Sequence, residues 1–168
     1  MKTVAFNGSA RRDGNTALLM DAVLQELEDE GIETEMVNLA DHEVRGCTAC
    51  YKCHETQDGR CVIDDDDINE FLGKMEEAEG ILIGSPTYFA DVSTETKGLI
   101  DRCGFVAKAN GGMLSRKVGA GVVAVRRAGS IHAFDTINHF FTISEMVIPG
   151  SIYWNMGFGL EKGEVSSD

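Results

Sequence analysis

The feature that most constrains the fold is an alternation of short, continuously apolar runs with longer amphipathic segments. The apolar runs are residues 3–6, 35–39, 80–84, 118–125 and 146–148. Runs of this kind are typical of strands buried on both faces of a sheet, with helices covering those faces. The pattern therefore predicts an α/β fold, a doubly wound five-stranded parallel sheet with helices on both faces.

Helices are expected between these runs, at about residues 16–30, from Ile68 through Met75, at about 93–107, and through Phe134–Phe141. Five strands and these helices suit a flavodoxin-like strand order of 2-1-3-4-5. In such a sheet, ligands bind beyond the carboxyl ends of the strands, near the switch in strand order. Loops 8–16, 85–91 and 126–129 are therefore the places where we expect a binding site.

Length and composition indicate one domain over residues 1–168, with an irregular, cysteine-rich loop at about 45–66. After Trp154 the tail is rich in glycine and shows no helical periodicity. The last helix of a doubly wound domain is missing from this pattern. Either a neighbouring subunit covers that face, or the natural chain continues beyond Asp168, and we expect the second.

Net charge excludes several partners. The formal charge of −13, with no basic stretch, argues against nucleic acid and anionic lipid. No apolar stretch approaches the roughly 20 residues of a membrane span. The N-terminus lacks the pattern of a signal peptide, so a cytoplasmic location is expected.

The first loop, Gly8–Thr16, has the features that a phosphate monoester requires. It joins the first strand to the first helix, so backbone N–H groups converge at a helix N-terminus. Ser9, Asn15 and Thr16 add short donors, and Arg11 adds a positive charge. Its glycine pattern is that of neither a Walker loop nor a dinucleotide-binding fingerprint.

Two later loops complete the predicted site. Residues Pro86, Thr87, Tyr88 and Phe89 follow the third strand and offer a rigid turn with two aromatic rings, suited to a flat cofactor. Residues Arg126–Gly129 follow the fourth strand and are expected at another edge of the site. A positive charge there would stabilise a reduced, anionic form of a redox cofactor; the alternative is a solvated basic turn.

Four of the five cysteines are clustered. Cys47, Cys50 and Cys53 form a C-x2-C-x2-C run, and Cys61 follows. Four thiolates so close in sequence suit a [4Fe–4S] cluster, whose irons each take one thiolate. A zinc site, a thiol–disulfide role and a loop without metal remain alternatives, although zinc sites usually draw on two separated C-x2-C pairs. Cys103 is expected to be a buried structural thiol.

The segment Gly-Ser-x-Arg-x-x-Gly-Asn-Thr at residues 8–16 resembles the NADPH-dependent FMN reductase family and, within it, the iron–sulfur flavoproteins. The resemblance covers roughly residues 3–155. It implies that Ser9, Arg11, Asn15 and Thr16 bind the 5′-phosphate of FMN, with Arg12 as a further candidate. It also implies that the Ser-Pro-x-Tyr segment holds the isoalloxazine ring, and that the four clustered cysteines ligate a [4Fe–4S] cluster. Lys97, Asp101 and Arg102 match the family's Lys-x-x-x-Asp-Arg, where packing or a subunit contact is expected.

The function that follows is an FMN-dependent oxidoreductase in which the cofactor carries the chemistry. Electrons would come from NAD(P)H or from a reduced ferredoxin-like protein, and pass to a quinone, a flavin, an oxygen species or a protein. A cluster-free NAD(P)H-dependent FMN or quinone reductase, a flavodoxin-like carrier and a redox sensor are the alternatives. The resemblance further implies a homodimer or homotetramer.

Overall fold

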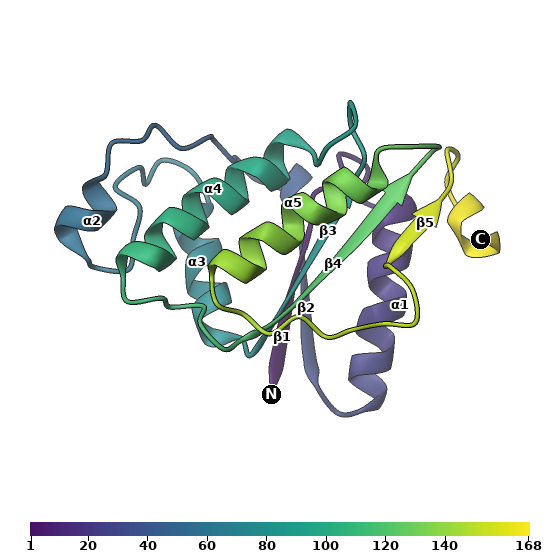
Figure 1. Ribbon diagram of the computed structural model, residues 1–168, viewed down its shortest axis with the longest axis horizontal. Helices are drawn as coiled ribbons and strands as arrows, with labels where there is room; N and C mark the ends of the chain where they lie inside the picture. Colours follow the sequence, from purple (N-terminus) through teal and green to yellow (C-terminus); the bar gives the residue numbers. More distant parts are fainter.

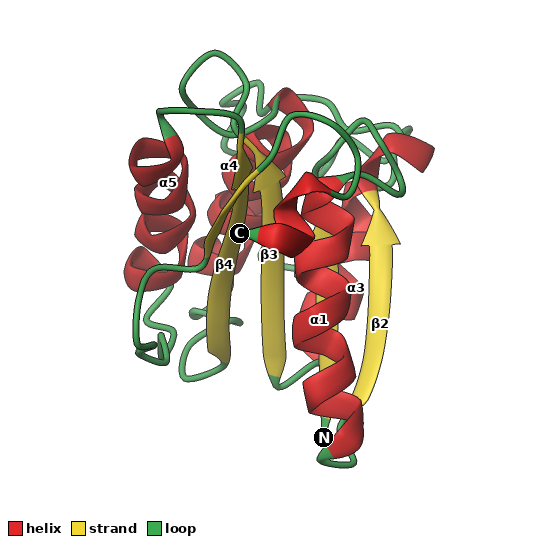
Figure 2. Cartoon of the chain, turned by 90° about the vertical axis from the view of Figure 1, so that its right-hand side faces the viewer, coloured by secondary structure: helices red, strands yellow, loops and turns green.

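Five parallel strands form a single sheet in the computed structural model, which describes residues 1–168 (Figure 1). The strands lie in the order β2-β1-β3-β4-β5, which confirms the predicted flavodoxin-like topology. Their bounds are β1 Lys2–Asn7, β2 Glu33–Asn38, β3 Gly80–Pro86, β4 Val118–Val125 and β5 Met156–Phe158. The carboxyl ends of the strands meet at one edge, where the connecting loops gather (Figure 2).

Helices cover both faces of the sheet, but unequally. On one face lies α1; on the other lie α3, α4 and α5 (Figure 2). The short helix α2 lies in the cysteine-rich loop, and two 3-10 helices, η1 and η2, follow β2 and β5. The helical bounds are α1 Asn15–Asp29, η1 Leu39–Asp41, α2 Lys52–Thr56, α3 Ile68–Glu77, α4 Thr94–Ala109, α5 Ser130–Ile143 and η2 Glu164–Ser167.

Successive side chains of the central strands point to opposite faces of the sheet, so the core is divided into two parts. In β1, Val4 and Phe6 point into a cluster of 24 buried residues under α3, α4 and α5, whereas Ala5 faces α1. The cluster on the α1 side contains five buried residues, among them Met20 and Leu24. Both faces are apolar, which is why these strands read as continuous apolar runs.

The fifth strand was predicted in the wrong place. Residues 146–148 make only an isolated bridge, between Val147 and Val118 at the start of β4. The chain then reaches the other end of β4, where Met156 pairs with Val123 and Phe158 with Val125. The apolar run at 146–148 instead supplies Met146 to the core, whereas Val147 is 55% exposed.

The glycine-rich tail is packed and partly ordered into secondary structure. A Cβ atom on Gly157 would lie 2.2 Å from a methyl group of Val165, so glycine allows η2 to lie against β5. Val165 of η2 is buried, and η2 contacts α1. No α-helix follows β5, in agreement with the missing periodicity. None of the helices has the length and apolar character needed to cross a bilayer.

Candidate functional site

The first loop is held at the carboxyl end of the sheet by close backbone contacts. The Gly8 amide donates to the Gly84 carbonyl at 2.8 Å. A Cβ atom on Gly8 would lie 1.8 Å from Thr96 Oγ1, so only glycine fits here. Ser9 is buried; its amide donates to Asn7 Oδ1, and its Oγ accepts from the Arg11 amide. The loop is thus shaped by its own polar groups.

The N-terminus of α1 is left open by this loop. Gly14 is the N-cap residue, and no side chain caps the helix. The amides of Asn15, Thr16 and Ala17 make no hydrogen bond within the protein. Thr16 is 2% exposed and Ala17 4%, so these donors lie at a nearly enclosed point. Unpaired amides at a helix N-terminus attract an anion, and a phosphate group suits them.

A cavity of about 270 Å³ connects this helix end with the later loops. It lies at the carboxyl ends of β1, β3 and β4. Thr87 Oγ1 is buried beside it without a hydrogen-bond partner, as expected of an atom that binds a ligand. The cavity is lined by Ser9, Arg11, Gly14, Asn15, Thr16, Pro86, Thr87, Tyr88, Ala124, Arg126, Gly159 and Leu160. Eight of the ten residues predicted to bind FMN are therefore brought together, from segments over a hundred positions apart.

The side chain of Asn15 is directed to the tail. Its Nδ2 donates to the Glu161 carbonyl at 2.9 Å, and its Oδ1 accepts from the Gly163 amide at 2.9 Å. Arg11 also reaches the tail, through a long 3.4 Å contact with the Leu160 carbonyl. Gly159 and Leu160 of this tail form a wall of the cavity, which periodicity in the tail did not reveal.

Phe89 and Gly129 do not line the cavity: Phe89 lies in the 88–91 turn beside it, and Gly129, at the start of α5, packs against that turn. Tyr88 and Asp91 exchange backbone hydrogen bonds, and Phe89 and Ala90 between them have φ values of 50° and 70°. The Phe89 side chain is fully exposed. Gly129 has φ 94°, and a Cβ atom there would lie 2.9 Å from Ala90 Cα. Gly129 therefore supports the turn by leaving space for it.

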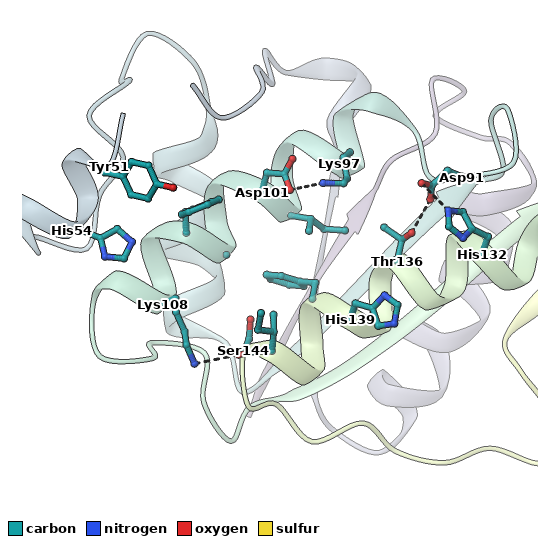
Figure 3. Close-up of a pocket in the computed structure, with 15 residues that line it drawn as sticks. Tyr51, His54, Asp91, Lys97, Asp101, Lys108, His132, Thr136, His139 and Ser144 are labelled. Atoms are coloured by element: carbon teal, nitrogen blue, oxygen red, sulfur yellow. Dashed lines mark hydrogen bonds and ion pairs between the residues drawn. The ribbon is translucent and has the colours of Figure 1, made fainter. Parts of the chain in front are cut away.

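Asp91 is a residue of this turn that sequence reasoning missed. Its Oδ1 accepts from the Thr136 hydroxyl at 2.8 Å, and its Oδ2 lies 3.3 Å from His132 Nε2, which ties the turn to α5 (Figure 3). Burial raises the pKa of this carboxyl, but hydrogen bonds from the Val92 amide and Thr136 outweigh it and lower the pKa. An isolated aspartate in a loop carries no sequence signal for such a role.

The largest cavity, about 720 Å³, is a separate groove between α4 and α5. Figure 3 shows Tyr51 and His54 at one end of it and Asp91 and His132 at the other. It contains none of the ten residues predicted to bind FMN. The residues predicted to bind FMN and the clustered cysteines therefore line two smaller cavities, one at the strand ends and one in the cysteine-rich loop.

The four clustered cysteines border one small cavity, together with Ile63, Arg102, Phe105 and Val106. Left-handed backbone at Ala49, Tyr51 and Gln57 folds the loop around it. All the cysteines are free thiols. No three His, Cys, Asp or Glu side chains lie close enough to hold one metal ion. A tetrahedral zinc requires sulfurs within about 3.8 Å of one another, whereas a cubane binds each thiolate to a different iron and suits a wider spacing.

The surroundings of these thiols differ. The Lys52 amide lowers the pKa of the Cys50 thiol, and burial raises the pKa of Cys53. Cys103 lies beneath the loop in α4, where burial raises its pKa strongly, in keeping with a structural thiol. The cluster ligands predicted from sequence are thus the accessible thiols, and Cys103 stands apart.

The predicted Asp101–Arg102 pair is divided between two partners. Asp101 pairs with Lys97 on the exposed side of α4. Arg102 turns inward to an ion pair with Asp66, in which both side chains are inaccessible to solvent. Burial alone would lower the pKa of Arg102, but the Asp66 and Cys61 side chains together have the larger effect, and the pKa is raised overall. A packing role was expected for this pair. Arg102 is buried as expected, and it packs against the cysteine-rich loop.

The fold defines a flavodoxin-like domain with a cavity at the carboxyl ends of its strands. The chain belongs to the NADPH-dependent FMN reductase family, which it matches over residues 1–161. Membership of this family makes it an FMN-dependent oxidoreductase. A Methanocaldococcus jannaschii protein named iron–sulfur flavoprotein is 39% identical over the whole chain and 88% of its own length. One from Methanosarcina thermophila is 33% identical over 92% of this chain and 83% of its own.

Solved structures agree in fold. RosB, determined with bound 8-demethyl-8-formylriboflavin-5′-phosphate, superposes with a TM-score of 0.72 at 20% identity over 97% of this chain; the chain spans 66% of RosB. The Trp repressor binding protein of Bacillus subtilis superposes with a TM-score of 0.71 at 16% identity, over 99% of this chain and 90% of its own. At these identities the likeness establishes the flavodoxin-like fold alone.

Proposed function

We propose that this chain is an FMN-dependent oxidoreductase that also carries a [4Fe–4S] cluster. It would pass electrons from NAD(P)H or a reduced ferredoxin-like protein to a quinone, flavin, oxygen species or protein acceptor. The observation that carries the proposal is the presence on one chain of two cavities. One joins unpaired helix amides to an aromatic turn, and the other is bordered by four free cysteines.

The first cavity suits FMN by its donors. The amides of residues 15–17 and the Arg11 guanidinium would bind the phosphate, and the Ser9 hydroxyl has a proton left to donate. Thr87 Oγ1 and Tyr88 would contact the ring, and Arg126 would lie at its edge. When bound, FMN supplies one- and two-electron redox chemistry. The protein contributes binding and orientation, and we assign no side chain as a general acid or a nucleophile.

The second cavity suits a cluster by its ligands and cover. Cys47 and Cys50 are exposed and Cys53 and Cys61 partly buried, so a bound cluster would be half covered by the loop. Apolar side chains on its inner side, Ile63 and Val106 among them, would shield it from water. The names of the relatives support the same proposal.

A cluster-free FMN reductase is the second candidate, favoured by the match of residues 1–161 to a family that is described by FMN reduction alone. The two candidates differ in iron content. We expect anaerobically purified protein to show flavin absorption bands, a broad shoulder from iron–sulfur charge transfer, and about four irons and four sulfides per chain. Flavin without iron, even after anaerobic reconstitution, would reject the cluster and support the cluster-free reductase.

The electron donor is tested separately. Mixing the loaded protein with NADH or NADPH under anaerobic conditions bleaches the flavin band if a nicotinamide nucleotide is the donor. Bleaching by reduced ferredoxin alone indicates the one-electron route. The homodimer or homotetramer expected from the family stays a prediction, which sedimentation equilibrium of the FMN-loaded protein tests.

A further inference from the structure

One buried arginine holds both ends of the cysteine loop. Arg102 Nη2 donates to the Ile63 carbonyl at 2.9 Å, just after Cys61. Its Nη1 contacts the Arg45 carbonyl at 3.4 Å, just before Cys47. One guanidinium of α4 thus contacts both ends of the loop over residues 45–63, and Asn69 and Asn110 add further hydrogen bonds to it.

Asp66 completes this anchor from the loop side. It pairs with Arg102, and its Oδ2 also accepts from the Arg45 amide at 3.3 Å. Both side chains of the pair are inaccessible to solvent. A planar guanidinium that meets a carboxylate and two carbonyls is held in a fixed orientation. Lysine would keep the positive charge but lacks the planar set of N–H donors that reaches these three acceptors.

One donor of that guanidinium has no partner. Arg102 Nε is buried, within a residue that is 1% exposed, and makes no hydrogen bond in the protein. Arg102 also lines the small cavity bordered by Cys47, Cys50, Cys53 and Cys61. A buried N–H group without an acceptor is rare, and a ligand that supplies the acceptor is one physical explanation. A thiolate or an inorganic sulfide is an acceptor of that kind.

We propose that Arg102 is a positioning residue for an iron–sulfur cluster, holding the ends of the cysteine loop and offering Nε–H to a sulfur of the bound cluster. This inference rests on the proposed function. Hydrogen bonds to the sulfurs and a nearby positive charge favour the reduced, more negative state of a cluster. Arg102 therefore raises the cluster's reduction potential as well as its retention.

The test compares two variants with the wild type, each reconstituted anaerobically. Arg102→Lys keeps a positive charge and loses the fork. Arg102→Gln combined with Asp66→Asn removes both charges and leaves no buried ion unpaired, so it guards against failure to fold. The readouts are iron and sulfide per chain, the rate of cluster bleaching in air, and the cluster midpoint potential from a redox titration followed by electron paramagnetic resonance.

We expect both variants to lose their cluster faster in air and to have a lower cluster potential. The FMN content and flavin potential should be unchanged, which shows that the fold is intact. Arg45→Gln is the control for charge, because Arg45 lies at one end of the loop, is half exposed and pairs closely with exposed Asp65, whereas its Nε lies 3.9 Å from Asp66. Its removal should change the cluster potential far less than either Arg102 variant.

The outcomes separate this inference from the function on which it rests. If the wild type takes up no iron, the proposed function is wrong and the inference fails with it. If the wild type binds the cluster while both Arg102 variants keep its potential and its lifetime in air, only the role of Arg102 is overturned. An equal shift in Arg45→Gln would reduce the effect to general surface charge and would also overturn it.

Discussion

Two adjacent arginines in the first loop have different surroundings. Arg11 lines the cavity beside the open end of α1. Arg12 points elsewhere, and its Nε pairs with Asp41 Oδ1 at 2.5 Å. A charge in the cavity can bind a phosphate, whereas a charge already paired on the surface has little effect on a ligand.

Substitution of Arg11 should therefore weaken FMN binding selectively. We expect Arg11→Gln to raise the Kd for FMN by about tenfold or more, because it removes one charge-assisted hydrogen bond worth about 1.5–3 kcal/mol. Arg12→Gln should change it by less than about twofold. Quenching of flavin fluorescence on titration of the apoprotein measures both. Equal effects of the two substitutions would place the phosphate elsewhere.

Gly129 acts at the same scale through the space that it leaves free. Its φ of 94° disfavours any residue with a side chain, and an added Cβ atom would press on the backbone of Ala90. We expect Gly129→Ala to destabilise the protein by about 1–3 kcal/mol and to weaken FMN binding, because the 88–91 turn must shift. Thermal unfolding and flavin titration measure the two effects.

Gly73 provides the control. It lies within α3, where an added Cβ atom meets nothing within 4 Å. Gly73→Ala should stabilise the protein by about 0.5–1 kcal/mol, because alanine is the better helix former, without changing the Kd for FMN. Weaker FMN binding in Gly73→Ala would mean that the effect of Gly129→Ala is not specific to the 88–91 turn.

At the scale of elements, one side chain of α1 makes two hydrogen bonds to the tail. Asn15 accepts from the Gly163 amide and donates to the Glu161 carbonyl, so it fixes the segment between β5 and η2. The same segment supplies Gly159 and Leu160 to the wall of the cavity. The first turn of α1 thus provides both the unpaired amides beside the cavity and the side chain that holds the tail.

Asn15→Ala should release this segment. We expect a loss of about 1–3 kcal/mol from two hydrogen bonds, and faster hydrogen exchange at the Gly163 amide. Gln25→Ala on the same helix is the control, since its hydrogen bond to Asp29 lies on the surface. Denaturant unfolding and hydrogen exchange measure the effects. Unchanged protection of the Gly163 amide in Asn15→Ala would show that other contacts hold the tail.

For the whole molecule, acid stability depends on paired carboxylates. The structure lowers the pKa of six carboxyl groups below the ordinary values of 3.8 for Asp and 4.5 for Glu: Asp13, Glu35, Asp65, Glu79, Asp91 and Glu164. A lowered pKa contributes stability that is present above the ordinary pKa and lost as the pH falls through the folded value. We therefore expect the melting temperature to fall steeply below about pH 4.5.

Glu35 tests this expectation. It bridges Lys2 of β1 and Lys74 of α3, and hydrogen bonds from Lys2 and then Lys74 lower its pKa. Glu35→Gln should lower stability at neutral pH and reduce the loss between neutral pH and pH 3. Melting curves across that range measure both. If the variant's acid profile parallels that of the wild type, Glu35 contributes nothing to acid stability.

Local pattern determined most of the architecture. The buried runs at 3–6, 80–84 and 118–125 are strands because both faces of the sheet are covered, and a continuous apolar run records that directly. The topology of such a sheet brings the ends of its strands together, so the loops at 8–16 and 85–88 meet without any contact being specified in advance. The first helix, the phosphate loop and the grouping of cysteines all follow from short-range spacing.

Tertiary structure decided what depends on contacts between distant segments. β5 has three residues, one a glycine, which is too short for periodicity to reveal, and it forms because β4 offers an unpaired edge. Asp91 meets Thr136 across 45 positions, and Arg102 meets Asp66 across 36. Apolar periodicity is a property of neighbouring residues, whereas an ion pair or a close backbone approach exists only once the chain has folded. The sequence by itself therefore determined the four longer strands and the loops at their carboxyl ends, and the folded structure determined the place of β5 and which side chains hold those loops in place.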